Sequence, residues 1–371
     1  MEIIIKTSQG LENILAKEVE EILGRSCEIG KRAVFITGTL QDVYLLNYKL
    51  RTAIRILVKM TSFTVHSYED VYRELNRMNW SEIFSLRESF SIDATVFSPY
   101  FKNSQYVMHK AKDAIADYFR DNYGKRPNVD RQNANIRINV HVTERKMNVS
   151  LDSSGESLHK RGYKRMHALA PVSEVLAAGM LQLSEWDKKT LLYDPMCGSG
   201  TLLTEAAMLK YDIPSQKHRD DFCFMHWKDF DKSAWMKIKR DNQKSLPSEN
   251  IQILGSDVDG DTIHDLESDL RHNKLSEYID VQEGDFFEIN ELETPHHIIM
   301  NPPYNKRLGL EDAKEFYQMI GDTLKQKCKG STAWVFSGEK ELIKFVGLRP
   351  SQKIILFNGP IEARFHKFEL F

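Results

Sequence analysis

The sequence is poor in cysteine and in long apolar runs. Its 371 residues include four cysteines, none in a Cys-x-x-Cys pair: Cys27, Cys197, Cys223 and Cys328. A disulfide framework is therefore not expected. No apolar run approaches the ~20 residues that cross a bilayer, and Ile3-Ile4-Ile5 is too short for the core of a signal peptide. These absences predict a cytoplasmic protein without membrane contact.

A metal site is not expected either. His218, Cys223 and His226 lie close together in an aromatic-rich stretch. A single trio of this kind is a weak signal for zinc, and we expect ordinary packing and surface roles for it.

The chain also lacks a strong net charge, which is -2. The distribution is uneven, however. Between Ser98 and Arg165 there are 14 Lys or Arg against 7 Asp or Glu, a local excess of +7 that leaves the rest of the chain about -9. One basic segment on an acidic protein predicts a localised polyanion-binding face. The length allows two or three domains.

Residues 1–65 show the alternation of a small α/β unit. The β-branched run Glu2–Lys6 predicts a strand, and the helically spaced apolar residues of Leu11–Leu23 predict a helix. Two strands follow this helix, the second of them at Ala33–Thr37. A helix at Leu40–Tyr48 and a strand at Ile54–Val65 come next. This order fits a ferredoxin-like unit.

Residues 66–165 form a second region of mixed elements. The clearest is a strand at Asn135–Val142, whose apolar residues alternate and so mark one buried face. We also expect helices near Val71–Met78 and Ser104–Tyr123, and strands near Ser89–Val96 and Lys146–Asp152.

Residues 166–371 alternate between strands and helices, which predicts a doubly wound, mainly parallel sheet. The expected strands are Leu191–Pro195, Ile251–Asp257, Ile279–Asp285, His297–Asn301 and Ser331–Ser337, with helices at Thr201–Lys210, Thr262–His272 and Ala313–Cys328. At the end, Asn358-Gly359-Pro360 joins Lys353–Phe357 to Ala363–Leu370 as a hairpin, so the last strand is antiparallel. A parallel sheet closed in this way resembles the class I Rossmann-like methyltransferases.

The first motif is the octet from Asp194 to Thr201, between a strand and a helix. Gly198 and Gly200 let the backbone approach a ligand closely. The helix that starts at Thr201 directs free N–H groups at a carboxylate, and Asp194 can accept hydrogen bonds from an ammonium. An amino-acid head group such as that of S-adenosylmethionine carries both charges. We assign cofactor binding to Asp194, Met196, Gly198, Gly200 and Thr201.

Acidic residues end the next two strands. Asp257 is placed to bind the hydroxyls of a ribose, with Val258 beside it, whereas Asp259 fits better as a helix cap. Asp285 could accept from the adenine amino group, and Phe286 could pack on the adenine ring. We therefore add Asp257, Val258, Asp285 and Phe286 to the cofactor site.

The motif Asn301-Pro302-Pro303-Tyr304 ends the fourth strand. Its prolines restrict the backbone and hold the Asn301 side chain and the Pro302 carbonyl as two acceptors. Two acceptors on the N–H bonds of a base amine can reorient its lone pair toward a methyl group. Tyr304 offers a face on which the base can stack. Asn301, Pro302 and Tyr304 are the expected catalytic residues, and Asn301 also borders the cofactor.

Taken together, several stretches resemble the THUMP-domain RNA methyltransferases, above all the bacterial enzymes that methylate guanine N2 in 23S ribosomal RNA. The stretches are Asn103-Ser104-Gln105-Tyr106, Arg126–Arg131, Leu151–Tyr163, Ala170-Pro171, Asp194–Thr201, Glu205–Met208, Asn301–Tyr304 and Asn358–Pro360. The resemblance implies a ferredoxin-like unit (1–65), a THUMP RNA-binding domain (66–165) and a Rossmann-like catalytic domain (166–371). It also implies S-adenosylmethionine as methyl donor and ribosomal RNA as partner.

Two departures from the family are visible. Glu362-Ala363 stands where relatives often carry an acidic residue and Cys, and the chain ends at Phe371, without the additional methyltransferase domain of fused relatives. We therefore expect no second methylation to be performed by this chain. The oligomeric state stays open, with a monomer favoured. The residues expected to contact RNA phosphates are Lys102, Lys110, Arg126, Arg131, Lys160 and Arg161.

Four alternatives stay open. An adenine-N6 RNA methyltransferase would use the same tetrapeptide on another base, and a tRNA guanine-N2 methyltransferase would differ only in its RNA. A glutamine-methylating enzyme would not need the basic segment. A non-enzymatic RNA-binding assembly factor would not need intact site residues.

Overall fold

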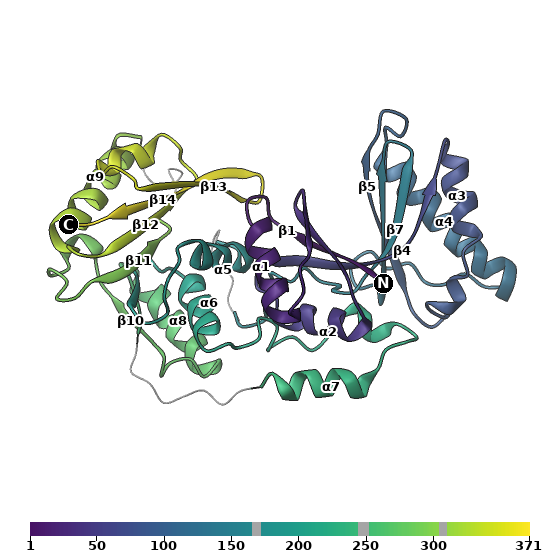
Figure 1. The fold of residues 1–371 in the computed structure, drawn as a ribbon, viewed down its shortest axis with the longest axis horizontal. Coiled ribbons are helices and arrows are strands. Elements are labelled where there is room, and N and C mark those ends of the chain that lie inside the picture. The colour runs from purple at the N-terminus through teal and green to yellow at the C-terminus, as the bar shows by residue number, and fades with distance from the viewer. Residues whose placement is uncertain (165–171, 244–251, 304–309) are drawn as a thin grey trace. The chain divides into compact units, whose positions relative to one another are not determined.

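The computed structural model describes residues 1–164, 172–243, 252–303 and 310–371, and Figure 1 draws its fold. The chain divides into two compact units. Unit 1 contains Met1–Thr7, Val19–Leu158 and Arg219–Asp241, and unit 2 contains Ser8–Glu18, His159–His218 and Asn242–Phe371. The segment Arg219–Asp241 therefore belongs with the N-terminal half of the chain, although it lies within the range 166–371.

Unit 1 is built on one seven-stranded sheet in the order β2-β3-β1-β4-β7-β6-β5. The strands are β1 (Glu2–Thr7), β2 (Glu28–Gly30), β3 (Ala33–Thr37), β4 (Ala53–Thr64), β5 (Phe90–Phe97), β6 (Ile136–Thr143) and β7 (Lys146–Asp152). The order predicted for residues 1–65 is confirmed. The sheet extends beyond residues 1–65, because β4 pairs antiparallel both with β1 and with β7.

The strand β6 shows why this sheet forms. Ile136, Ile138, Val140 and Val142 are all buried, while the residues between them are partly exposed, so one face of the strand lies in the core as predicted. β6 pairs parallel with β5 and antiparallel with β7.

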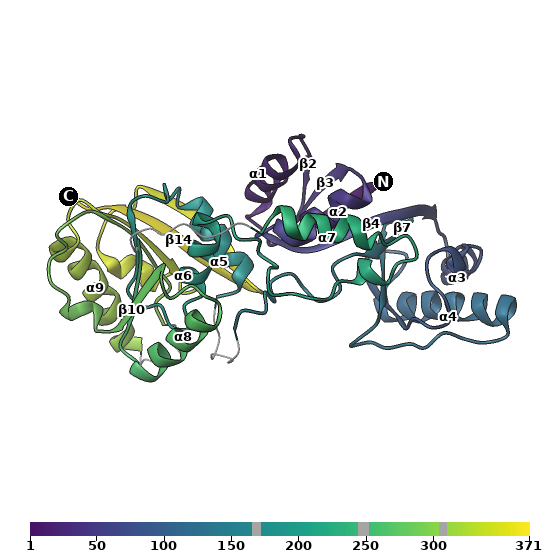
Figure 2. The same cartoon turned by 90° about the horizontal axis from the view of Figure 1, so that it is seen from below.

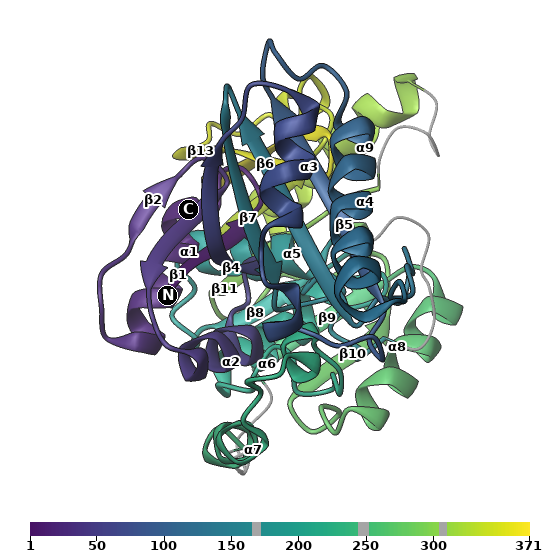
Figure 3. The same ribbon diagram turned by 90° about the vertical axis from the view of Figure 1, so that its right-hand side faces the viewer.

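Capping residues set the starts of several helices of unit 1. Thr39 and Ser67 each form a capping box, and Asn103 accepts from the Tyr106 N–H. The helices of this part of the chain are α1 (Glu12–Leu23, divided between the units), α2 (Leu40–Lys49), α3 (Tyr68–Asn76), α4 (Ser104–Tyr123) and α7 (Lys232–Asp241), with short 3-10 turns at Trp80–Glu82 and Cys223–His226. Figure 3 shows α3 and α4 side by side next to β5.

Aromatic packing holds the segment Arg219–Asp241 in unit 1. The ring of Tyr44, on α2, lies 4.6 Å from that of Phe224 and 6.3 Å from that of Trp235. The backbone N–H of Asp231 donates to the Tyr44 hydroxyl oxygen at 3.0 Å. The helix α7 buries only Trp235 and is not among the predicted elements.

Unit 2 contains the predicted mainly parallel sheet, in the order β10-β9-β8-β11-β12-β14-β13, which Figures 1 and 2 show with its helices. Its strands are β8 (Leu191–Asp194), β9 (Ile253–Asp257), β10 (Ile279–Glu283), β11 (His296–Met300), β12 (Thr332–Ser337), β13 (Gln352–Asn358) and β14 (Ile361–Glu369). β14 pairs antiparallel with β12 and β13, so the predicted closing hairpin is confirmed.

The helices of unit 2 are α5 (Glu174–Leu183), α6 (Thr201–Lys210), α8 (Gly260–His272) and α9 (Leu310–Lys327), with 3-10 turns at Phe286–Glu288 and Leu342–Val346. Ile298, Met300, Tyr317, Ile320 and Val335 belong to the core that joins the sheet to α9. Among the helices in the described ranges, none combines the length and apolarity needed to cross a membrane.

Candidate active site

Four parallel strands end side by side in unit 2. β10, β9, β8 and β11 are neighbours in that order, and every adjacent pair is parallel. Asp194 ends β8 and Asp257 ends β9, while Asn301 directly follows β11 and Asp285 lies two residues beyond β10. Because the carboxyl ends of parallel strands meet at one edge of a sheet, the structure brings these four predicted residues together.

Asp194 is a buried carboxyl, with 2% of its surface exposed. It accepts a hydrogen bond from the Met196 backbone N–H at 3.3 Å. Burial raises the pKa of Asp194 to about 8, and the charge of Asp257 adds to this increase. No cation forms an ion pair with Asp194 within the described ranges. A ligand ammonium would supply the missing partner.

The loop between β8 and α6 requires its two glycines for different reasons. Gly198 and Gly200 have φ values of +49° and +68°. A Cβ at Gly198 would meet nothing within 4 Å, so its backbone borders open space, whereas a Cβ at Gly200 would lie 2.3 Å from Leu266 on α8. Gly200 precedes α6 without a side-chain cap, so the first N–H groups of the helix, from Thr201 onward, point at this loop.

Asp257 organises the same loop. One carboxylate oxygen accepts the Gly198 N–H at 2.8 Å and the other accepts the Asp259 N–H at 3.1 Å. Each oxygen has a second lone pair for a ligand hydroxyl. Val258 is 71% exposed beside it. Asp259 accepts from the N–H groups of Asp261 and Thr262 at the start of α8, which confirms the prediction that Asp259 is a helix cap.

The third strand end differs from the prediction in one respect. Asp285 is half-buried, and its carboxylate accepts the Phe287 N–H at 2.8 Å. The ring of Phe286 is 2% exposed and packs in the core with Tyr193 and Ile298. The prediction that Phe286 packs on adenine is therefore wrong, because the ring presents no free face to a ligand.

Asn301 and Pro302 stand at the fourth strand end, next to β8. Asn301 is half-buried and Pro302 is buried, immediately after the fully buried strand β11. The fixed geometry of the Pro302 ring restricts the backbone of Asn301. Tyr304, the third predicted catalytic residue, lies outside the described residues.

This arrangement agrees with the comparison with known families. Residues 161–367 match the family described as "RMKL-like, methyltransferase domain". The chain belongs to this methyltransferase family. Residues 65–152 match the THUMP domain, and residues 2–57 match the RlmL ferredoxin-like domain.

Related proteins resemble the chain over nearly its whole length. The Synechocystis sp. protein named "Putative RNA methyltransferase slr0064" is 36% identical over 367 residues, which cover 98% of this chain and 95% of that protein. The structure of "a possible methylase from Clostridium difficile 630" has 26% identity and a TM-score of 0.89, covering 100% of this chain and 98% of that one. SMU.472, in complex with SAH, has 22% identity, a TM-score of 0.88 and the same coverage, and so shares the fold.

Lys164, in the methyltransferase domain, is absent from the site residues predicted above. Its ammonium donates to the Thr201 hydroxyl at 2.6 Å and lies 3.6 Å from the carboxylate of Glu174. Burial lowers the pKa of Lys164, and the charge of Glu174 opposes this decrease. A cation therefore stands at the first residue of α6. The sequence feature that could have indicated Lys164 is its position directly after the Leu151–Tyr163 stretch, which resembles the family.

Arg161 is not on a phosphate-contacting surface, so that prediction is wrong. Its side chain is fully buried, and its Nε donates to the fully buried carboxylate of Glu205 at 3.2 Å. The Tyr163 hydroxyl donates to the same oxygen at 3.3 Å. These contacts attach the segment of Arg161 and Tyr163 to α6 and leave no room for a phosphate. Lys160, in contrast, is exposed.

Two other predicted phosphate contacts, both near the THUMP helices, have carboxylate partners. The Lys110 ammonium lies 2.8 Å from Glu69 on α3, and the Arg126 guanidinium lies 2.5 Å from Asp117 on α4. All four residues are on or next to α3 and α4, and a neighbouring carboxylate reduces the attraction of each cation for phosphate.

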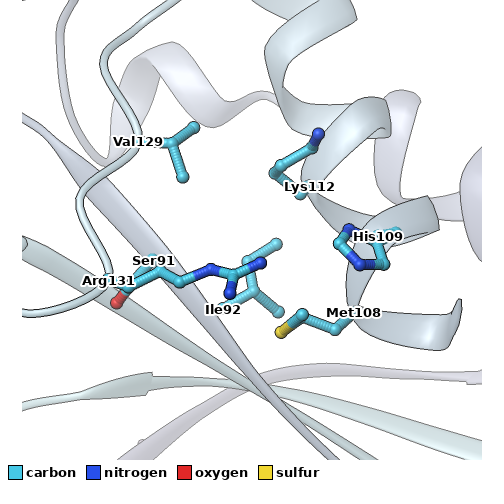
Figure 4. A pocket seen from close by; sticks show the side chains of 7 residues that line it. All are labelled: Ser91, Ile92, Met108, His109, Lys112, Val129 and Arg131. Carbon is cyan, nitrogen blue, oxygen red and sulfur yellow. The ribbon is translucent and has the colours of Figure 1, made fainter. Parts of the chain in front are cut away.

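Arg131 lies near other basic side chains, one of which, Lys112, is paired with Asp113 at 2.8 Å. It lines a pocket of the THUMP domain together with His109 and Lys112 of α4 and with Ile92 of β5, and Figure 4 shows its guanidinium extending between the strand and the helix. In the described part of the chain, no carboxylate forms an ion pair with Arg131. Lys102, two residues before the start of α4, is exposed.

Proposed function

We propose that the protein transfers the methyl group of S-adenosylmethionine to the exocyclic N2 of a guanine in RNA, with 23S ribosomal RNA as the substrate. The observation that carries this proposal is the meeting of the buried Asp194 with Asn301-Pro302 on neighbouring strand ends, in a chain of the RMKL-like family that also contains a THUMP domain.

The site fits the amino-acid part of the cofactor. Asp194 is buried without a cation and matches the ammonium. The N–H groups at the start of α6 and the Lys164 ammonium beside Thr201 match the carboxylate. The cofactor supplies a methyl group on a positively charged sulfur. The chain binds the cofactor through both the ammonium and the carboxylate of its amino-acid part.

The nucleoside part of the cofactor lies along the next strand ends. Asp257 keeps one lone pair on each oxygen for the ribose hydroxyls after it has accepted two backbone N–H groups. The exposed Val258 side chain takes the apolar contact with adenine that Phe286 cannot make. Asp285 accepts from the adenine amino group with the lone pairs that do not cap Phe287.

Asn301 and Pro302 act on the acceptor base. The side-chain oxygen of Asn301 and the carbonyl of Pro302 accept the two N–H bonds of the guanine N2. This raises the electron density on a nitrogen whose lone pair is otherwise delocalised into the ring. The new N–CH3 bond forms as the S–CH3 bond breaks, and the amine then loses one proton to water. Tyr304 stacks on the base.

Three features support RNA over a protein substrate. The chain contains a THUMP domain, its Synechocystis relative carries an RNA methyltransferase name, and Arg131, His109 and Lys112 gather on one pocket of that domain. A glutamine-methylating enzyme would need none of these. Guanine N2 of 23S ribosomal RNA follows from the sequence resemblance alone.

The proposal is tested by incubating the full chain with labelled S-adenosylmethionine and total RNA from cells that lack its gene. The expected product is N2-methylguanosine in 23S RNA. Label in N6-methyladenosine would identify the adenine enzyme instead, and label in transfer RNA would change the substrate. Label only in protein, or in no acceptor, would contradict the proposal.

A further inference from the structure

Three aromatic side chains are exposed at one end of the THUMP domain. Phe97, Tyr100 and Tyr106 are 65%, 52% and 44% exposed. They come from the end of β5, the loop that follows it and the first turn of α4. We call these three residues the aromatic tip. Single exposed apolar side chains are common, whereas three large exposed rings within ten consecutive residues make this part of the domain a candidate binding surface.

The backbone beneath the aromatic tip is held firmly. The Ser98 hydroxyl donates to the Glu144 carbonyl at 2.6 Å, and the Glu144 N–H donates to the Phe97 carbonyl at 3.0 Å. Phe101, between the exposed rings, is 1% exposed and anchors the loop. A surface fixed in this way loses little conformational entropy when a ligand binds.

Two of the rings have ordered neighbours. The Tyr106 ring lies edge-on to Tyr68 at 4.6 Å between centroids, and the Phe97 ring lies edge-on to His141 at 5.8 Å. These contacts set the orientation of each ring while leaving much of its surface in solvent. Much of each residue therefore stays exposed, while the Lys110 ammonium lies 5.7 Å from the centroid of the Tyr106 ring.

One cation is close in sequence to the aromatic tip, and another contacts it. The Arg145 guanidinium lies 4.1 Å from the centroid of the Tyr100 ring. The segments 98–103 and 143–146 contain three cations, Lys102, Arg145 and Lys146, against one carboxylate, Glu144, and all four are exposed. This surface complements a polyanion. The cores of protein–protein interfaces, in contrast, are depleted in charged residues.

We propose that the aromatic tip binds unpaired nucleotides of the RNA by stacking, with Arg145 and Lys102 on the adjacent phosphates. The inference rests on the proposed function. Aromatic rings can stack only on bases that have left a double helix, since the faces of paired bases are covered by their neighbours. The THUMP domain would then recognise a loop or a single-stranded end next to the structured part of the substrate.

The test uses the full chain and two fluorescent RNAs, an unstructured 12-mer and a perfect duplex of the same sequence. The double variant Phe97→Ala/Tyr100→Ala should bind the 12-mer at least tenfold more weakly. Its affinity for the duplex should stay within twofold. The salt slope should not change, because no phosphate contact is removed. Tyr123→Ala is the matched control, since Tyr123 is 53% exposed at the far end of α4.

A second variant separates stacking from loss of apolar surface. Phe97→Leu/Tyr100→Leu keeps apolar bulk but has no flat ring, so it should lose the same affinity as the alanine variant. Wild-type affinity in either double variant would overturn the proposal and leave the tip as a contact for a protein. An equal loss for duplex and 12-mer would also overturn it. If the wild-type chain binds neither RNA, the proposed function itself has failed.

Discussion

Replacing Asp194 by Asn tests whether a buried carboxyl without a cation is the anchor of the cofactor ammonium. Its pKa of about 8 means that Asp194 is protonated in the free protein at pH 6. To pair with an ammonium it must lose that proton, which costs ~1.4 kcal/mol for each pH unit below the pKa. Affinity for S-adenosylhomocysteine should therefore rise about tenfold between pH 5.5 and pH 6.5. The ligand amine stays charged in this range, because α-amino groups titrate at ~7.7–8.0.

Asp194→Asn has no proton to lose, so its affinity should be independent of pH over the same range. At pH 7.5 the variant should bind S-adenosylhomocysteine ~10- to 100-fold more weakly than wild type, since a charge-assisted hydrogen bond is lost. Calorimetry at pH 5.5, 6.5 and 7.5 measures both effects. Asp259→Asn is the matched control, because that exposed carboxyl caps α8 and should leave the pH profile unchanged.

Thermal stability gives an independent measure on the free protein. The Asp194 carboxyl has an ordinary pKa of 3.8 when unfolded and about 8 when folded. The folded state thus binds one more proton between these values, so stability falls as pH rises from about 4 to about 8 and is constant above. Asp194→Asn has no such proton, so its stability should not fall in this way. The difference in melting temperature between the variant and the wild type should therefore be larger at pH 7 than at pH 5, with the variant higher. A wild-type affinity that is flat between pH 5.5 and 6.5, or a variant that keeps the wild-type slope, would refute the reasoning.

Four further predictions concern single charged side chains. Asp257→Ala should weaken S-adenosylhomocysteine binding by roughly 1.5–3 kcal/mol without changing RNA affinity, whereas unchanged calorimetry would move the ribose contact to Asp259. Lys164→Met should weaken S-adenosylhomocysteine about tenfold but leave 5′-methylthioadenosine, which has no carboxylate, unaffected; equal losses for both ligands would refute the carboxylate contact. Arg131→Ala should flatten the salt dependence of RNA binding by ~0.7–0.9 log units per log unit of salt. Arg161→Ala should instead destabilise the fold by ~3–5 kcal/mol, because it breaks the buried ion pair with Glu205; a normal melting temperature in Arg161→Ala would contradict that role.

The parallel sheet could be predicted because the sequence pattern that specifies each of its elements is local. β8, β9 and β11 each precede an α-helix, and the acidic or Asn residues at the strand ends are recognisable one by one. The helix α5 was missed because seven of its ten residues are buried, so its sequence lacks the polar face that reveals a helix.

Contacts between distant parts of the chain account for the other errors. Arg161 looked like a surface cation because its partner Glu205 is 44 residues away. Phe286 was assigned to the ligand because sequence alone does not show toward which side of a strand end a ring turns. The pairing of β4 with β7, which makes one sheet of two predicted regions, depends on a register that neither strand encodes alone.

The central claim is that residues at two neighbouring strand ends have different roles. Asp194 binds the cofactor, and Asn301 binds the amine that accepts the methyl group. The most direct test measures S-adenosylhomocysteine affinity and single-turnover methyl transfer in Asn301→Ala. The account predicts cofactor affinity within twofold of wild type and a methyl-transfer rate lowered by ~2–4 kcal/mol of transition-state stabilisation, or about 30- to 1,000-fold. Turnover within threefold of wild type would contradict it.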